Sequence, residues 1–301
     1  MTPDGAGPRA VEVTLSSPAK VNLFLELVAR RTDGYHDIES VMQLVDLCDH
    51  VRLRKRARGI RVQVTGAELP AGRRNLAFRA AALLLEEAGV AGGVEINLDK
   101  RIPIAGGLGG GSSNAAAVLV GVARLYGLRT DRDVLQKLAL RLGSDVPFFL
   151  TDGLALARGR GELLTALRPW PPRWLVVANP GVPVSTAWAY QEASSKLTVG
   201  AGRVTIQPLI TDGRLPWPPV WAFNRLEAVV LPHREEVRAL KALLEAEGAA
   251  PVFMSGSGAS VVGVVPDEPT ARAVTEQARA RGCFAAGVCT LGANPIFADW
   301  A

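Results

Sequence analysis

The chain has 301 residues, 48% hydrophobic and 21% charged, with a formal net charge of +5 at pH 7, as is typical of a globular protein of about two domains. No apolar run approaches the roughly 20 residues of a membrane span, and the N-terminal residues lack the apolar core of a signal peptide, so we expect a cytoplasmic protein with no membrane partner. Three cysteines without a C-x-x-C pair and three scattered histidines indicate neither a disulfide framework nor a zinc site.

The first half of the sequence predicts strands mixed with helices. Strand patterns lie at residues 12–30 and 94–105, and helix patterns lie at residues 75–89, from Ser112 onward, and at residues 131–143, where Gly143 should end the helix. The order of these elements is that of an α+β protein rather than a regular alternation of strand and helix.

A basic segment, VRLRKRARGIRV at residues 51–62, is the feature that favours a nucleic-acid partner. Its apolar residues, Val51, Leu53, Ile60 and Val62, alternate with basic ones, which is the pattern of a strand with one solvated face. We therefore expect a β-hairpin here. A mildly basic surface also suits an enzyme whose substrates are polyanions.

The second half begins after a cluster of proline and tryptophan at residues 169–174, which indicates a junction before a fresh strand. We place the boundary near Leu164, which gives domains of residues 1–164 and 165–301. The sequence of the second domain predicts, in order, a strand at 174–180, a proline-rich loop, a helix at 234–248, a strand pair within 251–265, a helix at 270–282 and a final strand. Such a run predicts a ferredoxin-like layer.

Five of the six residues from Gly106 to Gly111 are glycines, and a helix follows them. Glycine costs backbone entropy, so a cluster of glycines indicates unusual backbone angles or close approach of a ligand. Ser112 or Ser113 is a natural N-cap, and the free amides of a helix N-terminus attract anions. The loop lacks the lysine of a P-loop and the G-x-G-x-x-G spacing of a dinucleotide fingerprint. An apolar strand and an alanine-rich helix bracket it, which disfavours a flexible linker, so we expect a bound polyphosphate.

Polar residues in two apolar segments are candidates for the chemistry. Lys20 and Asn22 share one face of a strand while Val21 and Leu23 take the other, so one face should look into a cleft unless Lys20 is a surface residue. Asp145 precedes a run that should be buried. It either caps a helix or serves as a carboxylate that accepts or orients a hydroxyl proton during phosphoryl transfer, with a lysine and Mg²⁺ absorbing charge.

Two further loops could contact a ligand. In RTDGYHDIES, a turn at Asp33 and Gly34 presents Tyr35 and His36, which could stack on a planar base and hydrogen-bond its edge. A second glycine–serine loop, SGSGAS at residues 255–260, is either an ordinary strand turn or a loop that closes over the same ligand.

The segments PAKVNLFLEL, PIAGGLGGGSSNAAAVL and SGSGAS, in this order, resemble the three motifs of the GHMP kinases, and RTDGYHDIES and LGSDVPFF extend the resemblance over most of the chain. It implies an α+β, two-domain GHMP kinase fold, with an N-terminal half like domain 2 of ribosomal protein S5 and a C-terminal ferredoxin-like layer. It also implies ATP-dependent phosphorylation of an alcohol, with Mg²⁺ carried by ATP. Within the resemblance, the combination of RTDGYHDIES, GGLGGGSSNAA and LGSDVPFF points to a cytidine diphosphate sugar alcohol as the acceptor. We expect small-molecule partners without nucleic acid, and a monomer or homodimer.

The resemblance also assigns roles to residues. Asp145 would be the catalytic carboxylate and Lys20 its cationic partner. Substrate contacts would come from Asn22 near the reacting centre, Tyr35 by stacking, His36 by hydrogen bonds, Tyr190 as an opposite stacking wall, and Thr186. The nucleotide would be bound by Lys100, Pro103, Ala105, Gly106, Gly107, Leu108, Gly109, Gly110, Gly111, Ser112 and Ser113. No protein ligand to Mg²⁺ is assigned. The alternatives are a GHMP kinase for another small alcohol and a basic RNA-binding module.

Overall fold

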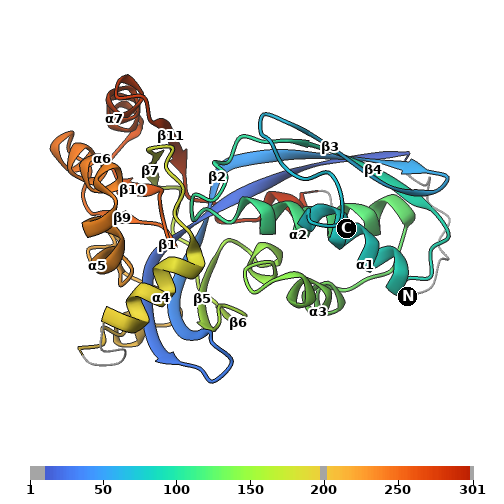
Figure 1. The fold of residues 1–301 in the computed structure, drawn as a ribbon, viewed down its shortest axis with the longest axis horizontal. Helices are drawn as coiled ribbons and strands as arrows, with labels where there is room; N and C mark the ends of the chain where they lie inside the picture. Colours follow the sequence, from blue (N-terminus) through green and yellow to red (C-terminus); the bar gives the residue numbers. More distant parts are fainter. Residues whose placement is uncertain (1–10, 197–201, 299–301) are drawn as a thin grey trace.

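Two β-sheets, each with helices on one face, make up the part of the chain that the computed structural model describes, residues 11–196 and 202–298 (Figure 1). The strands are β1 (Glu12–Arg30), β2 (His36–Arg56), β3 (Gly59–Thr65), β4 (Gly93–Asp99), β5 (Leu154–Gly159), β6 (Leu163–Ala166), β7 (Trp174–Asn179), β8 (Phe223–Asn224), β9 (Val252–Met254), β10 (Val261–Val264) and β11 (Phe284–Cys289). The α-helices are α1 (Leu76–Glu87), α2 (Gly110–Tyr126), α3 (Arg132–Leu142), α4 (Thr186–Lys196), α5 (Glu227–Val230), α6 (Glu235–Ala246) and α7 (Glu268–Ala280), and the 3-10 turns are η1 (Pro147–Leu150), η2 (Gln207–Leu209), η3 (Leu231–His233) and η4 (Pro295–Phe297).

The larger sheet is built around the antiparallel strands β1 and β2, which run through both halves of the molecule (Figure 1). Its order is β3-β4-β2-β1-β8, and β5 pairs with both β2 and β6. As predicted, the side chains of β1 alternate: Val21 and Leu23 are fully buried in a core between the two sheets, whereas Lys20 and Asn22 line a cavity.

The basic segment forms strands, but the expectation of a hairpin is wrong. Strand β4 lies between β2 and β3, antiparallel to the first and parallel to the second. Its first residue, Gly93, passes so close to the connection between β2 and β3 that a Cβ there would lie 2.1 Å from Gly59 O. The alternation itself is confirmed, because Val51 and Leu53 are fully buried and Arg52 between them is exposed.

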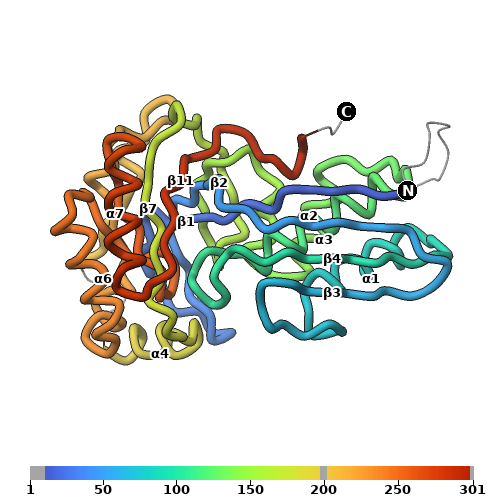
Figure 2. The backbone as a smooth tube through the Cα atoms, turned by 90° about the horizontal axis from the view of Figure 1, so that it is seen from above, coloured from blue at the N-terminus to red at the C-terminus, as the bar shows by residue number. Residues whose placement is uncertain are grey.

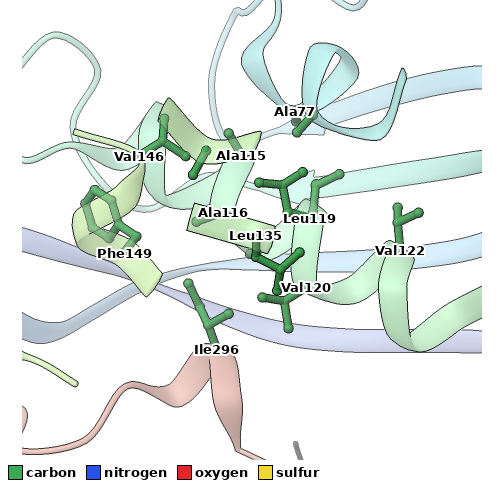
Figure 3. Close-up of a cluster of buried hydrophobic side chains, with 14 of the residues drawn as sticks. Ala77, Ala115, Ala116, Leu119, Val120, Val122, Leu135, Val146, Phe149 and Ile296 are labelled. Atoms are coloured by element: carbon green, nitrogen blue, oxygen red, sulfur yellow. The ribbon is translucent and has the colours of Figure 1, made fainter. Parts of the chain in front are cut away.

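Helices α1, α2 and α3 cover one face of the larger sheet and bury the first core (Figure 3). Asn75, which the sequence places in the helix pattern, is the N-cap of α1 and accepts a hydrogen bond from Ala77 N, whereas Gly143 ends α3 as the sequence predicts. Helix α2 is buried nearly all round, because small side chains such as Ala115 let it approach its neighbours closely. Ile296, from the C-terminal part of the chain, completes this core on the side of Val120 (Figure 3).

The second sheet has the antiparallel order β11-β7-β10-β9, with α6 and α7 side by side on its outer face (Figure 2). The order of elements, β7, helices ending in α6, β9, β10, α7 and β11, confirms the ferredoxin-like layer. Between its first two strands the chain returns to the larger sheet as β8, which pairs with β1. Leu164 lies in β6, and the division into residues 1–164 and 165–301 stays a proposal.

A third core fills the space between the two sheets and holds them together. It combines Val21 and Leu23 of β1 with Leu175 and Val177 of β7, among others. Within residues 11–196 and 202–298, none of the helices has both the length and the apolar character that crossing a bilayer requires.

Candidate active site

A cavity of about 1140 Å³ lies where the glycine loop, the strand β1, the turn before β2 and the helix α4 meet. Its lining includes all the residues to which the resemblance assigns a catalytic, substrate-binding or nucleotide-binding role, with one exception. Ser113 is fully buried, and its hydroxyl accepts a hydrogen bond from Ser17 Oγ at 2.7 Å. The separated motifs of the sequence therefore form one site.

The glycine loop ends in a helix N-terminus that faces this cavity. The N-cap of α2 is Gly109, with a left-handed φ of 70° and no side-chain cap, so the expectation of a serine cap at Ser112 or Ser113 is wrong. Ser113 N donates to Gly109 O, which leaves the amides of Gly110, Gly111 and Ser112 without helical partners. These three residues line the cavity, so the positive end of the helix dipole points into it.

Packing demands glycine at two positions of the loop. A Cβ on Gly107 would lie 2.1 Å from Ser255 O, and one on Gly109 would lie 2.7 Å from Phe149 Cζ. Both residues also have positive φ angles, 73° and 70°. The glycines therefore bring the backbone against protein on one side while presenting it to the cavity on the other.

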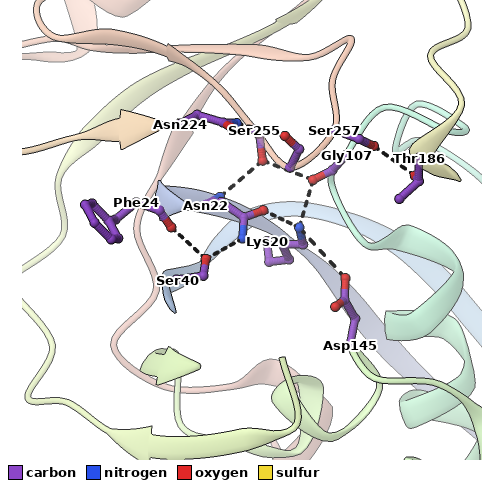
Figure 4. Close-up of polar contacts among 11 residues, drawn as sticks. Lys20, Asn22, Phe24, Ser40, Gly107, Asp145, Thr186, Asn224, Ser255 and Ser257 are labelled. Carbon is purple, nitrogen blue, oxygen red and sulfur yellow. Dashed lines mark hydrogen bonds and ion pairs between the residues drawn. The ribbon is translucent and has the colours of Figure 1, made fainter. Parts of the chain in front are cut away.

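The second glycine–serine loop, between β9 and β10, contacts the first. Ser255 Oγ donates to Gly107 O at 3.0 Å (Figure 4), and Ser260 N donates to Gly106 O at 3.3 Å. Ser257 shares a hydrogen bond of 2.9 Å with Thr186 at the start of α4. The two loops, from different sheets, thus hold each other and line the same cavity.

Lys20, Asn22 and Asp145 form a charged cluster at the floor of the cavity (Figure 4). Lys20 Nζ donates to Asn22 Oδ1 and, at 3.0 Å, to Gly107 O, and it lies 3.9 Å from Asp145 Oδ2. Asn22 Nδ2 donates to Ser40 Oγ at 2.8 Å, which fixes the amide with its oxygen toward the lysine. The Lys20 side chain is 5% exposed and that of Asp145 38%, so the carboxylate reaches the open part of the cavity.

Burial controls the ionisation of Lys20. Removal from water lowers the pKa of its ammonium group, and the negative charge of Asp145 partly counteracts that effect. The alternative role of Asp145 as a helix cap is wrong, because the C-cap of α3 is Gly143 and the N-cap of the following turn η1 is Val146. The carboxylate of Asp145 is therefore placed beside a cation, facing the cavity.

Lys100 lines the cavity, but its ammonium group is bound within the protein. Lys100 Nζ donates to Asp49 Oδ2 and, at 3.0 Å, to Asn114 Oδ1. The other oxygen of Asp49 accepts from Arg101 N at 2.7 Å and from Ile102 N at 2.9 Å. Asp49 is fully buried. It anchors the segment that leads into the glycine loop, a role that its sequence context did not indicate.

Aromatic residues lie at the other end of the cavity. Tyr35 is 57% exposed, and the guanidinium group of Arg160, another lining residue, lies 5.3 Å from its ring centroid. His36 is buried, and its ring packs against that of Tyr190 with centroids 5.5 Å apart and planes inclined by 45°. Burial, and secondarily the charge of Arg30, lower the pKa of His36. Burial, helped by Asp145, raises the pKa of Tyr190.

The fold and this site define a GHMP kinase, and comparison with known proteins agrees. The model of the GHMP kinase N-terminal domain matches residues 75–153, and that of the C-terminal domain matches residues 212–282. The 4-diphosphocytidyl-2-C-methyl-D-erythritol kinase of Geobacter sulfurreducens is 43% identical over 93% of this chain and 99% of its own length. The protein of the same name from Synechococcus sp. is 42% identical over 84% of this chain and 85% of its own length. The chain belongs to the 4-diphosphocytidyl-2-C-methyl-D-erythritol kinase family of GHMP kinases.

Solved structures support the assignment. A crystal structure of 4-(cytidine 5'-diphospho)-2C-methyl-D-erythritol kinase has 37% sequence identity and a TM-score of 0.78, and it covers 93% of this chain and 99% of that one. Homoserine kinase from Cytophaga hutchinsonii has a TM-score of 0.71 at 20% identity, over 96% and 98% of the two chains, which shows the shared fold alone. The expected α+β GHMP kinase fold is confirmed, and the protein is an ATP-dependent kinase.

Proposed function

We propose that this chain transfers the γ-phosphoryl group of ATP to the 2-hydroxyl of 4-diphosphocytidyl-2-C-methyl-D-erythritol, giving the 2-phosphate and ADP, in the non-mevalonate route to isoprenoid precursors. The observation that carries the proposal is the shared cavity, in which Lys20 lies against Gly109 at the uncapped helix N-terminus, while its partner Asp145 is near enough to act on Tyr190, which packs against His36. This order matches an acceptor whose reacting hydroxyl is held between a nucleotide triphosphate and a pyrimidine.

The helix N-terminus supports binding of the ATP phosphates. The amides of Gly110, Gly111 and Ser112 supply donors, and the helix dipole favours the negative charge. Lys100, neutralised by Asp49, acts mainly by holding the loop. Mg²⁺ is usually held by substrate phosphates with one or two carboxylates rather than by a protein cage, and residues 11–196 and 202–298 contain no cluster of three or more His, Cys, Asp or Glu ligands. We propose that Mg²⁺ arrives with ATP and neutralises phosphate charge.

The Lys20–Asp145 pair supports the chemical step. The acceptor oxygen attacks the γ-phosphorus while its proton passes to, or is oriented by, the carboxylate of Asp145. The bond between the γ-phosphorus and the bridging oxygen breaks, and ADP leaves with the electron pair. The ammonium of Lys20 holds the carboxylate and the Gly107 carbonyl in place, and Asn22 supports Lys20 from the other side.

The opposite end of the cavity supports recognition of the cytosine. Tyr35 is exposed enough to stack on a base, and His36, a residue of the cavity wall, has a buried ring nitrogen without a partner among the described residues. Tyr190 packs against His36 and so completes the wall. Thr186, tied to Ser257, would contact the substrate between the two ends.

The experiment that tests the proposal measures ADP release with Mg²⁺-ATP and 4-diphosphocytidyl-2-C-methyl-D-erythritol, beside the same sugar alcohol phosphate lacking its cytosine. Turnover of only the complete substrate would support both the phosphoryl transfer and the pyrimidine site. Equal turnover of the two would overturn the substrate assignment. If neither reacts, a panel of other small alcohols, and then salt-dependent RNA binding, would decide between the remaining alternatives.

A further inference from the structure

The side chain of Ser194, on α4, joins His36 to the backbone of its own helix. Ser194 Oγ lies 2.5 Å from His36 Nε2 and donates to Tyr190 O at 2.9 Å. A serine hydroxyl has one hydrogen, and here the carbonyl one turn earlier in the helix takes it. The hydroxyl oxygen must therefore accept a hydrogen from the imidazole, so Nε2 of His36 is the protonated nitrogen.

The other ring nitrogen of His36 is then an acceptor. Burial and the charge of Arg30 lower the pKa of His36, so the ring is neutral at pH 7 and carries one ring hydrogen rather than two. With that hydrogen on Nε2, Nδ1 carries a lone pair. Nδ1 is buried and has no hydrogen-bond partner within the described part of the chain, although the ring belongs to the cavity wall. A buried acceptor without a partner favours a ligand that brings a donor.

We propose that Ser194 is a positioning residue that fixes His36 as the Nε2–H tautomer, so that the site selects a pyrimidine bearing an amino group over one bearing a carbonyl at the same place. The inference rests on the proposed function, because it deepens the recognition of the cytidine substrate. The exocyclic amino group of cytosine donates and suits the lone pair of Nδ1. The corresponding carbonyl of uracil only accepts, so it would leave two acceptors facing each other.

The tautomer is tested directly by the nitrogen chemical shifts of the His36 ring, which distinguish a protonated from an unprotonated nitrogen in the full-length protein. In the native protein without substrate, we expect Nε2 to be protonated and Nδ1 unprotonated. In Ser194→Ala, we expect ring-nitrogen shifts that indicate a mixture of tautomers or the other tautomer. Ser194→Thr keeps a hydroxyl that can bond the same carbonyl and should restore the native signature. A native ring with the hydrogen on Nδ1 would overturn the proposal.

The selectivity is tested by comparing kcat/KM for the cytidine substrate with that for its uridine analogue. Loss of one neutral hydrogen bond should reduce the preference for cytidine about threefold to tenfold in Ser194→Ala, through KM for the cytidine compound, with kcat and KM for ATP unchanged. Ser195→Ala is the matched control, because its exposed hydroxyl also bonds a backbone carbonyl of α4, Glu192 O at 3.0 Å, but does not contact His36.

The outcomes separate this inference from the proposed function. The role of Ser194 would be refuted if Ser194→Ala kept the native preference for cytidine over uridine, or if the Ser195→Ala control lost as much of that preference. Either result would count even if the enzyme phosphorylates the cytidine compound. Failure of the native protein to use that compound would refute the substrate assignment and the selectivity, while the ring-nitrogen measurement would still decide whether Ser194 fixes the tautomer.

Discussion

Replacing Asp145 by Asn removes one negative charge at the floor of the cavity with almost no change in side-chain size. An amide does not accept a proton from the acceptor hydroxyl, so we expect kcat to fall about 10²-fold or more, as for loss of a positioned general base. KM for ATP should change little, because the backbone amides at the start of α2 are untouched.

The same substitution also has an electrostatic effect on Lys20, whose Nζ lies 3.9 Å from Asp145 Oδ2. Two unit charges at that distance attract by about 4 kcal/mol at an effective dielectric constant of about 20, and by about 1 kcal/mol in water. The Asp145 side chain is 38% exposed, which puts the attraction near the lower figure, about 1 to 2 kcal/mol. Its loss lets burial lower the pKa of Lys20 further.

A pH profile of kcat, followed by ADP release, measures both effects. Lys20 loses its positive charge as the pH rises through its lowered pKa, so activity should fall on the alkaline side, and the fall should begin at lower pH in the variant. Asp152→Asn, an exposed carboxylate paired with Arg132, is the control and should leave the profile unchanged. Near-normal turnover of Asp145→Asn would remove this carboxylate from the mechanism, and an unmoved alkaline limb would refute its coupling to Lys20.

Three further predictions concern binding and stability. Tyr35→Ala should weaken binding of the cytidine substrate by about 1 to 3 kcal/mol, measured as a rise in its KM, and should leave KM for ATP unaffected. An unchanged KM for the cytidine substrate would argue against stacking. Asp49→Asn leaves the buried ammonium of Lys100 without its counter-charge and should lower the free energy of unfolding by about 3 to 5 kcal/mol in urea titrations, whereas a loss below about 1 kcal/mol would show that the pair is dispensable. Leu119→Ala, in the fully buried face of α2, should cost about 2 to 5 kcal/mol on the same assay, and the exposed Leu140→Ala should cost almost nothing.

The details of individual elements that the sequence predicted are those with a local cause. The helix pattern that begins at residue 75, the terminating Gly143 and the alternation around Lys20 each depend on residues a few positions apart. The hairpin at the basic segment failed because β4, more than 30 residues later, enters between β2 and β3, and Gly93 permits that approach. Strand order depends on the whole chain, and local sequence patterns do not determine it.

The residues of the candidate site also divide into those that a local motif reveals and those whose partners are distant in the sequence. Nearly all of the residues taken from motifs meet in one cavity, because each motif keeps its own backbone geometry. Gly109, rather than a serine, starts α2, since a left-handed residue turns the loop into the helix. Asp49 and Ser194 escaped notice because their partners, Lys100 and His36, lie 51 and 158 residues away. Neither position has a local pattern that distinguishes it from an ordinary polar residue.

The 3-10 turn η4, which follows the last strand of the second sheet, has a consequence for the order in which the protein can fold during synthesis. Ile296 lies in the first core, and Asn294 donates to Phe149 O and Thr151 O, at 2.8 and 2.9 Å. These residues are synthesised after almost all of the chain they contact. While the ribosome is still translating the second half, the core of the first half therefore lacks Ile296, and the carbonyl groups of Phe149 and Thr151 lack the Asn294 donor, so this half reaches its final packing only after residues 294–296 have been made.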